Sequence, residues 1–193
     1  MCPYSNSSPA TWNNITKSLI EAHPLKSDVL VSAVLSAWQS IFRSSIGEGL
    51  IGRDIFPQPQ IMGYLLHELV PLELQSRYPG IWQRDVTSAD KDIVYIPDPR
   101  FSIEVKTSSD PRHIFGNRSY AQETTNGKKA KTGYYLAINF QKFDATPSTP
   151  QIVRIRFGWL DATDWIGQKA ATGQQSRLPK EIYEGKLLTI YQM

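Results

Sequence analysis

The sequence has almost no cysteine, since Cys2 is the only one among its 193 residues. A single thiol can form no disulfide within the chain and cannot supply a Cys-rich zinc site. Long apolar runs are also missing, because Ser, Gln or charged residues interrupt each hydrophobic stretch well short of a membrane span. The first residues, 1–6, have neither the basic start nor the apolar run of a signal peptide. These absences predict a cytoplasmic protein without disulfides.

A strong excess of one charge is absent as well, because the net charge is only +3 and the sequence pI is about 8.9. This mild basicity alone is weak evidence for a polyanionic partner. The charge is unevenly distributed, however. Residues 105–142 hold seven basic side chains against two acidic ones, which are Asp110 and Glu123. This segment is therefore the part of the chain most suited to a negatively charged partner.

Hydrophobic residues make up 40% of the chain and charged residues 20%, as in globular proteins with a real core. Three helices are predicted from apolar residues at helical spacing, over residues 9–22, 28–46 and 60–70. Ser8 is the expected N-cap of the first, Gly47 the expected end of the second, and Pro71 is expected to kink or end the third. Trp12 and Trp38 are expected in the core, with a dimer interface as the alternative.

The hydrophobic period then changes to that of strands. Residues 92–96 and 101–106 flank the turn-forming segment Pro97-Asp98-Pro99-Arg100, which predicts a hairpin. Later strands are predicted over residues 134–140, 152–159 and 187–191. Helices followed by a hairpin and further strands indicate an α/β (α+β) fold with a mixed central β-sheet flanked by helices.

The second hairpin strand alternates apolar and polar residues. Ile103 and Val105 are expected to face the core, and this places Glu104 and Lys106 together on the other face. If the connecting loop has three residues, antiparallel pairing brings Asp92 close to Glu104. The hairpin therefore predicts two carboxylates and a lysine at one end of a sheet.

These three residues suit phosphodiester cleavage. Asp92 and Glu104 offer hard oxygen ligands for Mg²⁺, which polarises a scissile phosphate. Lys106 can orient or help to deprotonate the attacking water and neutralise charge in the transition state. A Glu-x-Lys pattern alone is more often a solvated face or a cross-strand ion pair. The hairpin and the basic segment after it favour the nuclease interpretation.

This arrangement resembles the PD-(D/E)xK nucleases, which place an Asp at the start of one strand and Glu-x-Lys on the next. The matching residues are Asp92, Glu104 and Lys106, within a segment of about fifteen residues. The resemblance implies a restriction-endonuclease-like core with Mg²⁺ bound by Asp92 and Glu104. Lys91 stands where the family has Pro. A literal Pro-Asp occurs at Pro97-Asp98, but we interpret Asp98 as a turn residue.

Members of this superfamily often carry a further carboxylate on a helix before the hairpin. Glu68 occupies such a place, and the resemblance makes it a possible fourth catalytic residue, with an exposed helix carboxylate as the alternative. His67-Glu68 lacks the second His of a zinc-protease helix, so that chemistry is excluded.

The polar region after the hairpin mixes Arg, Asn and Ser with an aromatic residue. Arg and Asn are residue types that read base edges, and Ser and Lys suit phosphate contacts. A solvated loop is the alternative. The predicted DNA-binding residues are Ser108, Arg112, Asn117, Arg118, Lys128, Lys129 and Lys131.

The runs 114–121 and 157–161 are similar to those of ScaI-type restriction endonucleases. That resemblance implies a Type II enzyme that cuts double-stranded DNA at a short palindrome as a homodimer. We expect one nuclease domain over residues 1–193, with an N-terminal helical part at 1–58 and a catalytic core at 59–193. The alternatives are a structure-selective repair or junction-resolving nuclease and a DNA-binding module without catalysis.

Overall fold

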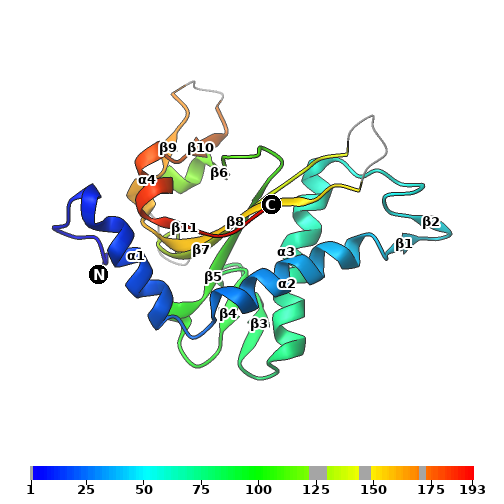
Figure 1. The fold of residues 1–193 in the computed structure, drawn as a ribbon, viewed down its shortest axis with the longest axis horizontal. Coiled ribbons are helices and arrows are strands. Elements are labelled where there is room, and N and C mark those ends of the chain that lie inside the picture. The colour runs from blue at the N-terminus through cyan, green and yellow to red at the C-terminus, as the bar shows by residue number, and fades with distance from the viewer. Residues whose placement is uncertain (1, 122–129, 144–148, 170–172) are drawn as a thin grey trace.

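A six-stranded mixed sheet forms the centre of the computed structural model, which describes residues 2–121, 130–143, 149–169 and 173–193 (Figure 1). The strand order is β11-β8-β7-β5-β4-β3. Only β5 and β7 are parallel, and the other neighbours are antiparallel. The strands are β3 (Trp82–Arg84), β4 (Ile93–Tyr95), β5 (Ile103–Ser108), β7 (Gly133–Phe140), β8 (Ile152–Leu160) and β11 (Leu187–Gln192).

Three longer helices cover one face of this sheet. In Figure 1, α2 and α3 lie against each other on one side and α1 lies at the opposite end of the sheet. Their buried side chains form one hydrophobic core with Leu136, Ile138 and Phe157 of β7 and β8. The helices are α1 (Pro9–Ala22), α2 (Ser27–Ile41) and α3 (Pro59–Arg77).

The other face of the sheet carries a second, smaller core. Tyr135 and Ala137 of β7 pack there with Trp165 and with Ile182 of α4 (Lys180–Gly185). A small antiparallel sheet in the order β6-β10-β9 lies beside α4. The remaining elements are β1 (Ser45–Ile46), β2 (Gly49–Leu50), β6 (Phe115–Asn117), β9 (Ile166–Gly167), β10 (Gln175–Arg177), η1 (Pro99–Phe101), η2 (Arg118–Ala121) and η3 (Ala162–Asp164).

The predicted helix at 9–22 is confirmed, although the Ser8 side chain makes no capping hydrogen bond. The prediction for 28–46 was too long, because α2 ends at Ile41 and residues 45–50 form a tight hairpin. Gly47 adopts a φ of 59° in that hairpin, so it turns two strands rather than ending a helix.

The third predicted helix, 60–70, was too short. Pro71 is buried and α3 continues through it to Arg77. Its missing amide removes one helical hydrogen bond, and the burial of Val70 and Leu74 on either side offsets that loss.

All the strands predicted from sequence are present, including the hairpin of β4 and β5. The α+β class with a mixed central sheet is therefore confirmed. The second hairpin strand begins at Ile103 rather than at residue 101, because Pro99–Phe101 form a 3-10 turn. Trp38 is buried and donates from Nε1 to the Pro150 carbonyl, so it is a core residue. In the described ranges, none of the helices combines the length and apolar character needed to cross a bilayer.

Candidate active site

The hairpin of β4 and β5 fixes the geometry of the candidate site. Ile93 pairs with Ile103, and the same register carried one residue further sets Asp92 opposite Glu104. The Asp92 carboxylate accepts a hydrogen bond from the Val105 amide, with 2.7 Å between Oδ2 and N. The hairpin thus brings Asp92 to the strand that carries Glu104, as its turn sequence predicts.

Glu104 and Lys106 meet on one face of β5. Lys106 Nζ lies 2.7 Å from Glu104 Oε1 and also donates to the Val105 carbonyl at 3.1 Å. The Glu104 side chain is 3% exposed and that of Lys106 is 12% exposed. Such burial excludes a solvated strand face, and enclosed charges of this kind are typical of functional sites.

Tyr120 of η2 lies over this pair. Its hydroxyl donates to Glu104 Oε1 at 2.5 Å, and Lys106 Nζ stands 4.6 Å from the centre of its ring. Burial, followed by the negative charge of Glu104, raises the pKa of the Tyr120 phenol well above its usual value. The hydroxyl therefore remains a proton donor to Glu104 at any physiological pH.

The sequence placed Tyr120 in a segment expected to contact DNA, and the contact with Glu104 was missed. Glu104 and Tyr120 are 16 residues apart and belong to different elements, β5 and η2. Hydrophobic periodicity relates only residues of one element, so it carries no signal for such a contact.

Helix α3 adds a histidine to the site. His67 Nδ1 is 3.6 Å from Asp92 Oδ2. The next residue, Glu68, faces Arg84, with 3.5 Å between Oε2 and Nη2, and its side chain is 39% exposed. The structure therefore brings His67 to Asp92, whereas Glu68 forms an ion pair with Arg84 on β3.

The donor atoms fit a hard divalent cation. Asp92 and Glu104 supply carboxylate oxygens, and the Val105 carbonyl follows Glu104 directly in the chain. Within the described ranges, no three or more His, Cys, Asp or Glu residues gather into a metal-binding group. Mg²⁺ is commonly held by one or two carboxylates, and substrate phosphate and water complete its shell. Asp92 and Glu104 are the residues that would hold it.

A cavity of about 500 Å³ lies between α3, the end of β5 and the small sheet. His67 from the candidate site and Thr107 from β5 are in its wall. Its other walls include Tyr64, Ser108, Asn117 and Gln175. The polar lining beside the Asp92–Lys106 segment suits a phosphodiester backbone.

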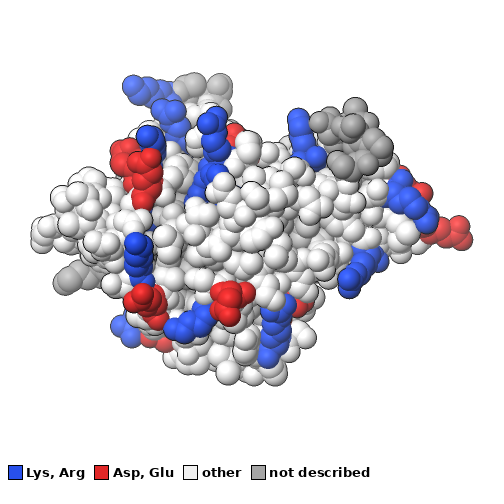
Figure 2. Space-filling model, viewed as in Figure 1, with Lys and Arg blue, Asp and Glu red and all other residues white. Residues whose placement is uncertain are grey.

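The predicted DNA-binding residues are dispersed. Ser108 and Asn117 line the 500 Å³ cavity, whereas Arg112 lies in a different pocket. Arg118 donates from Nη1 to the Gly173 carbonyl at 3.3 Å, and Lys131 donates to the Ser119 carbonyl. Lys128 and Lys129 lie outside the described residues. On the face drawn in Figure 2, Lys and Arg side chains are spread over the molecule rather than gathered in one patch.

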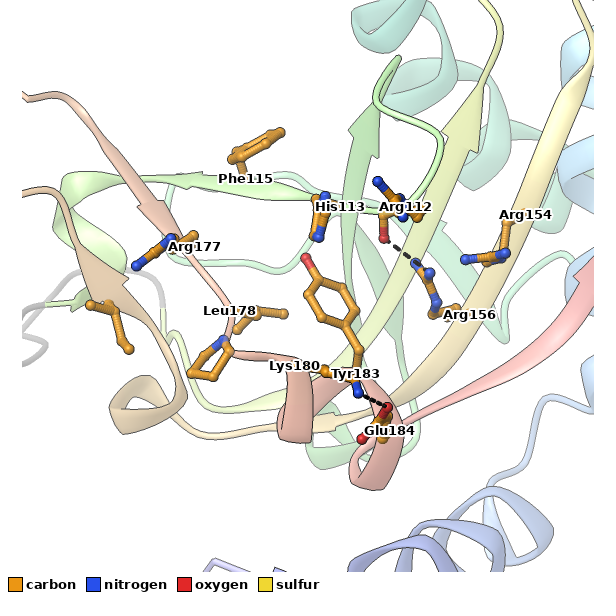
Figure 3. Close-up of a pocket in the computed structure, with 12 residues that line it drawn as sticks. Arg112, His113, Phe115, Arg154, Arg156, Arg177, Leu178, Lys180, Tyr183 and Glu184 are labelled. Carbon is orange, nitrogen blue, oxygen red and sulfur yellow. Dashed lines mark hydrogen bonds and ion pairs between the residues drawn. The ribbon is translucent and has the colours of Figure 1, made fainter.

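The pocket that holds Arg112 is strongly basic (Figure 3). Its volume is about 750 Å³, and Glu184 is the one acidic residue in its wall. Its cationic residues come from the loop before β6 and from β8, β10 and α4. They are Arg112, Arg154, Arg156, Arg177 and Lys180.

Arg156 forms the floor of this basic pocket. It donates to Asn139 Oδ1 and to the Arg112 carbonyl, both at 3.0 Å, and its guanidinium lies 5.0 Å from the centre of the Tyr183 ring. Burial, followed by repulsion from Arg154, lowers its pKa to about 10. The positively charged side chains of this pocket therefore outnumber its negatively charged ones.

The chain is similar to a known restriction endonuclease over nearly its whole length. The family model for the ScaI restriction endonuclease matches residues 2–191. Type II restriction enzyme ScaI from Streptomyces caespitosus is 50% identical over 192 residues, which cover 98% of this chain and 84% of that protein. No solved structure matches the chain. With nearly its whole length matched, this chain belongs to the ScaI restriction endonuclease family.

Proposed function

We propose that this Type II restriction endonuclease hydrolyses phosphodiester bonds of double-stranded DNA at a short palindrome with Mg²⁺, using Asp92, Glu104 and Lys106. The observation that carries the assignment is the enclosed Glu104–Lys106 pair on the strand whose Val105 amide binds Asp92. The three residues also match the PD-(D/E)xK pattern in position and spacing. Sequence-specific DNA cleavage is the activity of the family to which the chain belongs.

Each residue of the site has a distinct task in this proposal. Asp92 and Glu104 would hold Mg²⁺, which would polarise the scissile phosphate and offset the charge that develops on it. Lys106 orients the attacking water, helps to remove its proton and neutralises the transition state. Tyr120 fixes the Glu104 carboxylate by donating to Oε1. His67 positions Asp92 from α3, and Glu68 is a candidate for a fourth carboxylate.

DNA contacts extend outward from the site. We assign Ser108 and Asn117 to the DNA strand in the 500 Å³ cavity. Arg112 contacts backbone phosphate at the basic pocket. We assign Arg118 and Lys131 to phosphate by their charge, together with Lys128 and Lys129, which lie outside the described residues. Affinity should fall as salt rises, because cations released from DNA drive such contacts.

A homodimer fits this chemistry. One chain holds one Asp92–Glu104–Lys106 set, and a palindrome presents the same bond on each strand, related by a two-fold axis. Helices α1 and α2 share the main core with the central sheet, which supports a single nuclease domain over residues 1–193.

Digestion of plasmid DNA tests the function. The wild-type protein with Mg²⁺ should give discrete fragments, and run-off sequencing of their ends should define one site and one cut position. Asp92→Asn, Glu104→Gln and Lys106→Ala should each lower the cleavage rate by about a thousandfold or more, since each removes a group that acts in the transition state.

Asp98→Asn is the matched control. Asp98 is the carboxylate of the literal Pro-Asp, but it accepts hydrogen bonds from the Arg100 amide and guanidinium in the η1 turn. This variant should cut at the wild-type rate. Full activity of Glu104→Gln and Lys106→Ala, with circular dichroism unchanged, would contradict the site assignment. Preferential cleavage of junctions over linear duplex would contradict the restriction activity.

A further inference from the structure

The strands β6 and β10 form the longer pair of the small three-stranded sheet, and the two-residue strand β9 pairs with the other edge of β10. We call the β6–β10 pair the ribbon. Gln175 is paired with Asn117, and Arg177 is paired with Phe115. All four side chains are exposed, whereas Gly116 and Ser176 between them are buried. We call the exposed set of Phe115, Asn117, Gln175 and Arg177 the ribbon face.

The polar groups of the ribbon face are available to a ligand. Within the described part of the chain, the side chains of Asn117, Gln175 and Arg177 form no hydrogen bond or ion pair. Arg118 differs, because its guanidinium is bound to the Gly173 carbonyl. The ribbon face also has no acidic residue, so nothing on it repels a nucleic acid.

These residue types match the base edges of the DNA major groove. Asn and Gln amides can bind adenine at two points, and an Arg guanidinium can bind guanine in the same way. An exposed Phe can contact a thymine methyl group, and Phe115 is 39% exposed. The major groove is wide enough to admit a two-stranded β-ribbon, and β9 adds only Ile166 and Gly167 beside β10.

The ribbon lies between two sites suited to phosphate. Asn117 and Gln175 line the 500 Å³ cavity beside the catalytic residues, and Arg177 lines the basic pocket. Phe115 lines both, and Figure 3 shows it together with Arg177 on the ribbon side of the basic pocket. A ribbon inserted in a groove has one DNA backbone on each side. One DNA backbone would then lie at the catalytic site, and the other would lie beside Arg112 and Arg154.

The inner side of the ribbon contacts the catalytic machinery. A Cβ added at Gly116 would lie 2.8 Å from Ser176 Oγ and 3.0 Å from the ring of Tyr120, so the strand presses directly on Tyr120. Tyr120 in turn donates to Glu104. Ser176 Oγ donates to the Asn117 carbonyl at 3.0 Å and ties the two strands together.

From these observations we infer that the ribbon face is the base-reading surface of the enzyme. Asn117, Gln175 and Arg177 bind base edges in the major groove, and Arg112 and Arg154 bind the backbone beside it. This inference rests on the proposed function for its ligand, which is double-stranded DNA. It adds Gln175 and Arg177, which lie far from the polar segment around Asn117 in sequence.

Selection from a pool of random duplexes tests the inference through binding alone. Wild-type protein and the variants Asn117→Ala, Gln175→Ala and Arg177→Ala select DNA in Ca²⁺ in place of Mg²⁺. Each variant should bind the wild-type site about 10- to 100-fold more weakly and accept other bases at particular positions. Affinity for a random duplex should change less than about threefold, because phosphate contacts carry no sequence information.

Two exposed residues of the α2 region provide matched controls. Gln39→Ala and Arg43→Ala remove the same groups as Gln175→Ala and Arg177→Ala and should leave the selected site and its affinity unchanged. Arg154→Ala should instead weaken binding to all duplexes equally and lower the salt dependence by about one counterion.

The outcomes separate this inference from the nuclease proposal. Variants that select the wild-type site with undiminished strength, or that lose affinity equally for all duplexes, overturn the base-reading role. A wild-type protein that selects no site overturns it as well. If selection relaxes as expected but plasmid is not cut in Mg²⁺, the base-reading role stands and the nuclease proposal fails.

Discussion

At the scale of single residues, Glu104 has the most constrained surroundings in the candidate site. It is buried, and one of its oxygens receives hydrogen bonds from both Lys106 and Tyr120. A carboxylate taken out of water needs such donors to remain charged. The Tyr120 hydroxyl is therefore a positioning group for the carboxylate that we assign to Mg²⁺.

Tyr120→Phe should lower the cleavage rate constant about 10- to 100-fold, since a hydrogen bond to a charged group is worth roughly 1.5–3 kcal/mol. The Michaelis constant should change little, because Tyr120 lies on Glu104 and not on the ribbon face. Steady-state cleavage of an oligonucleotide duplex measures both constants. Tyr191→Phe, on β11, is the control. An unchanged rate constant in Tyr120→Phe would show that Lys106 alone positions Glu104.

His23 is a buried polar residue that contributes to stability rather than to the candidate active site. It is fully buried after α1, where Nδ1 accepts from the Leu25 amide at 3.1 Å and Nε2 lies 3.0 Å from the Phe101 carbonyl. Burial lowers the pKa of His23 below its usual 6.5. The neutral ring therefore stabilises the junction between α1 and the hairpin turn.

Stability should fall as the pH decreases below about 6.5. Below this pH the unfolded chain takes up a proton at His23, whereas the buried ring of the folded protein stays neutral. The contribution of His23 to the free energy of unfolding is therefore complete above about pH 6.5 and is lost as the pH falls toward the lower pKa of His23 in the folded protein. Urea unfolding at pH 7.5 and 5.5 measures this change. His23→Gln should be less stable than the wild type at pH 7.5, but its stability should depend less on pH. Equal pH sensitivity of His23→Gln and wild type would exclude this role.

At the scale of elements, the close approach of α3 to β5 positions His67 beside Asp92. A Cβ added at Gly63 would lie 2.6 Å from Thr107 Oγ1, so the helix and strand touch at this point. Glycine is needed here for space rather than for backbone conformation, because a helical φ is open to any residue. The same contact sets one wall of the 500 Å³ cavity.

Gly63→Ala should destabilise the protein by roughly 1–3 kcal/mol, the usual cost of overpacking a closely packed contact. It should also lower the cleavage rate by moving His67 away from Asp92. Chemical unfolding and cleavage assays measure the two effects. Adding Thr107→Ala should restore most of the stability, because Oγ1 is the atom that clashes. Ser76→Ala, exposed on the same helix, is the control. A stable Gly63→Ala protein would mean that α3 shifts without cost.

Local patterns account for the hairpin but not for the ribbon. The turn Pro97-Asp98-Pro99-Arg100 and the alternation on β5 predicted that Asp92 lies close to Glu104, and the register of the structure agrees with this proximity. The strands β6 and β10 have only three residues each and come from distant parts of the chain. Their pairing depends on tertiary packing around Tyr120, so Gln175 and Arg177 could not be associated with Asn117 from sequence.

At the scale of the whole molecule, the number of catalytic sets determines how a duplex is cut. One chain carries one Asp92–Glu104–Lys106 set, and a single set held in one orientation attacks one strand. In the proposed homodimer, two chains related by two-fold symmetry each cut one strand of a palindrome. From the proposed dimer we therefore predict the form of the cleaved DNA as well as the molecular mass of the enzyme.

Mixed dimers should nick DNA rather than cut it. Wild-type chains and Glu104→Gln chains with different affinity tags are co-expressed, and the mixed species is purified through both tags. On supercoiled plasmid it should yield open circles, because only one chain of each dimer can cleave.

A dimer that combines wild-type with Asp98→Asn chains should give linear DNA. Linear product from the Glu104→Gln mixed dimer at the wild-type rate would show that one active chain cuts both strands. Sedimentation at the assay concentration establishes that the species is dimeric, and a monomer that cuts both strands would overturn the two-site arrangement.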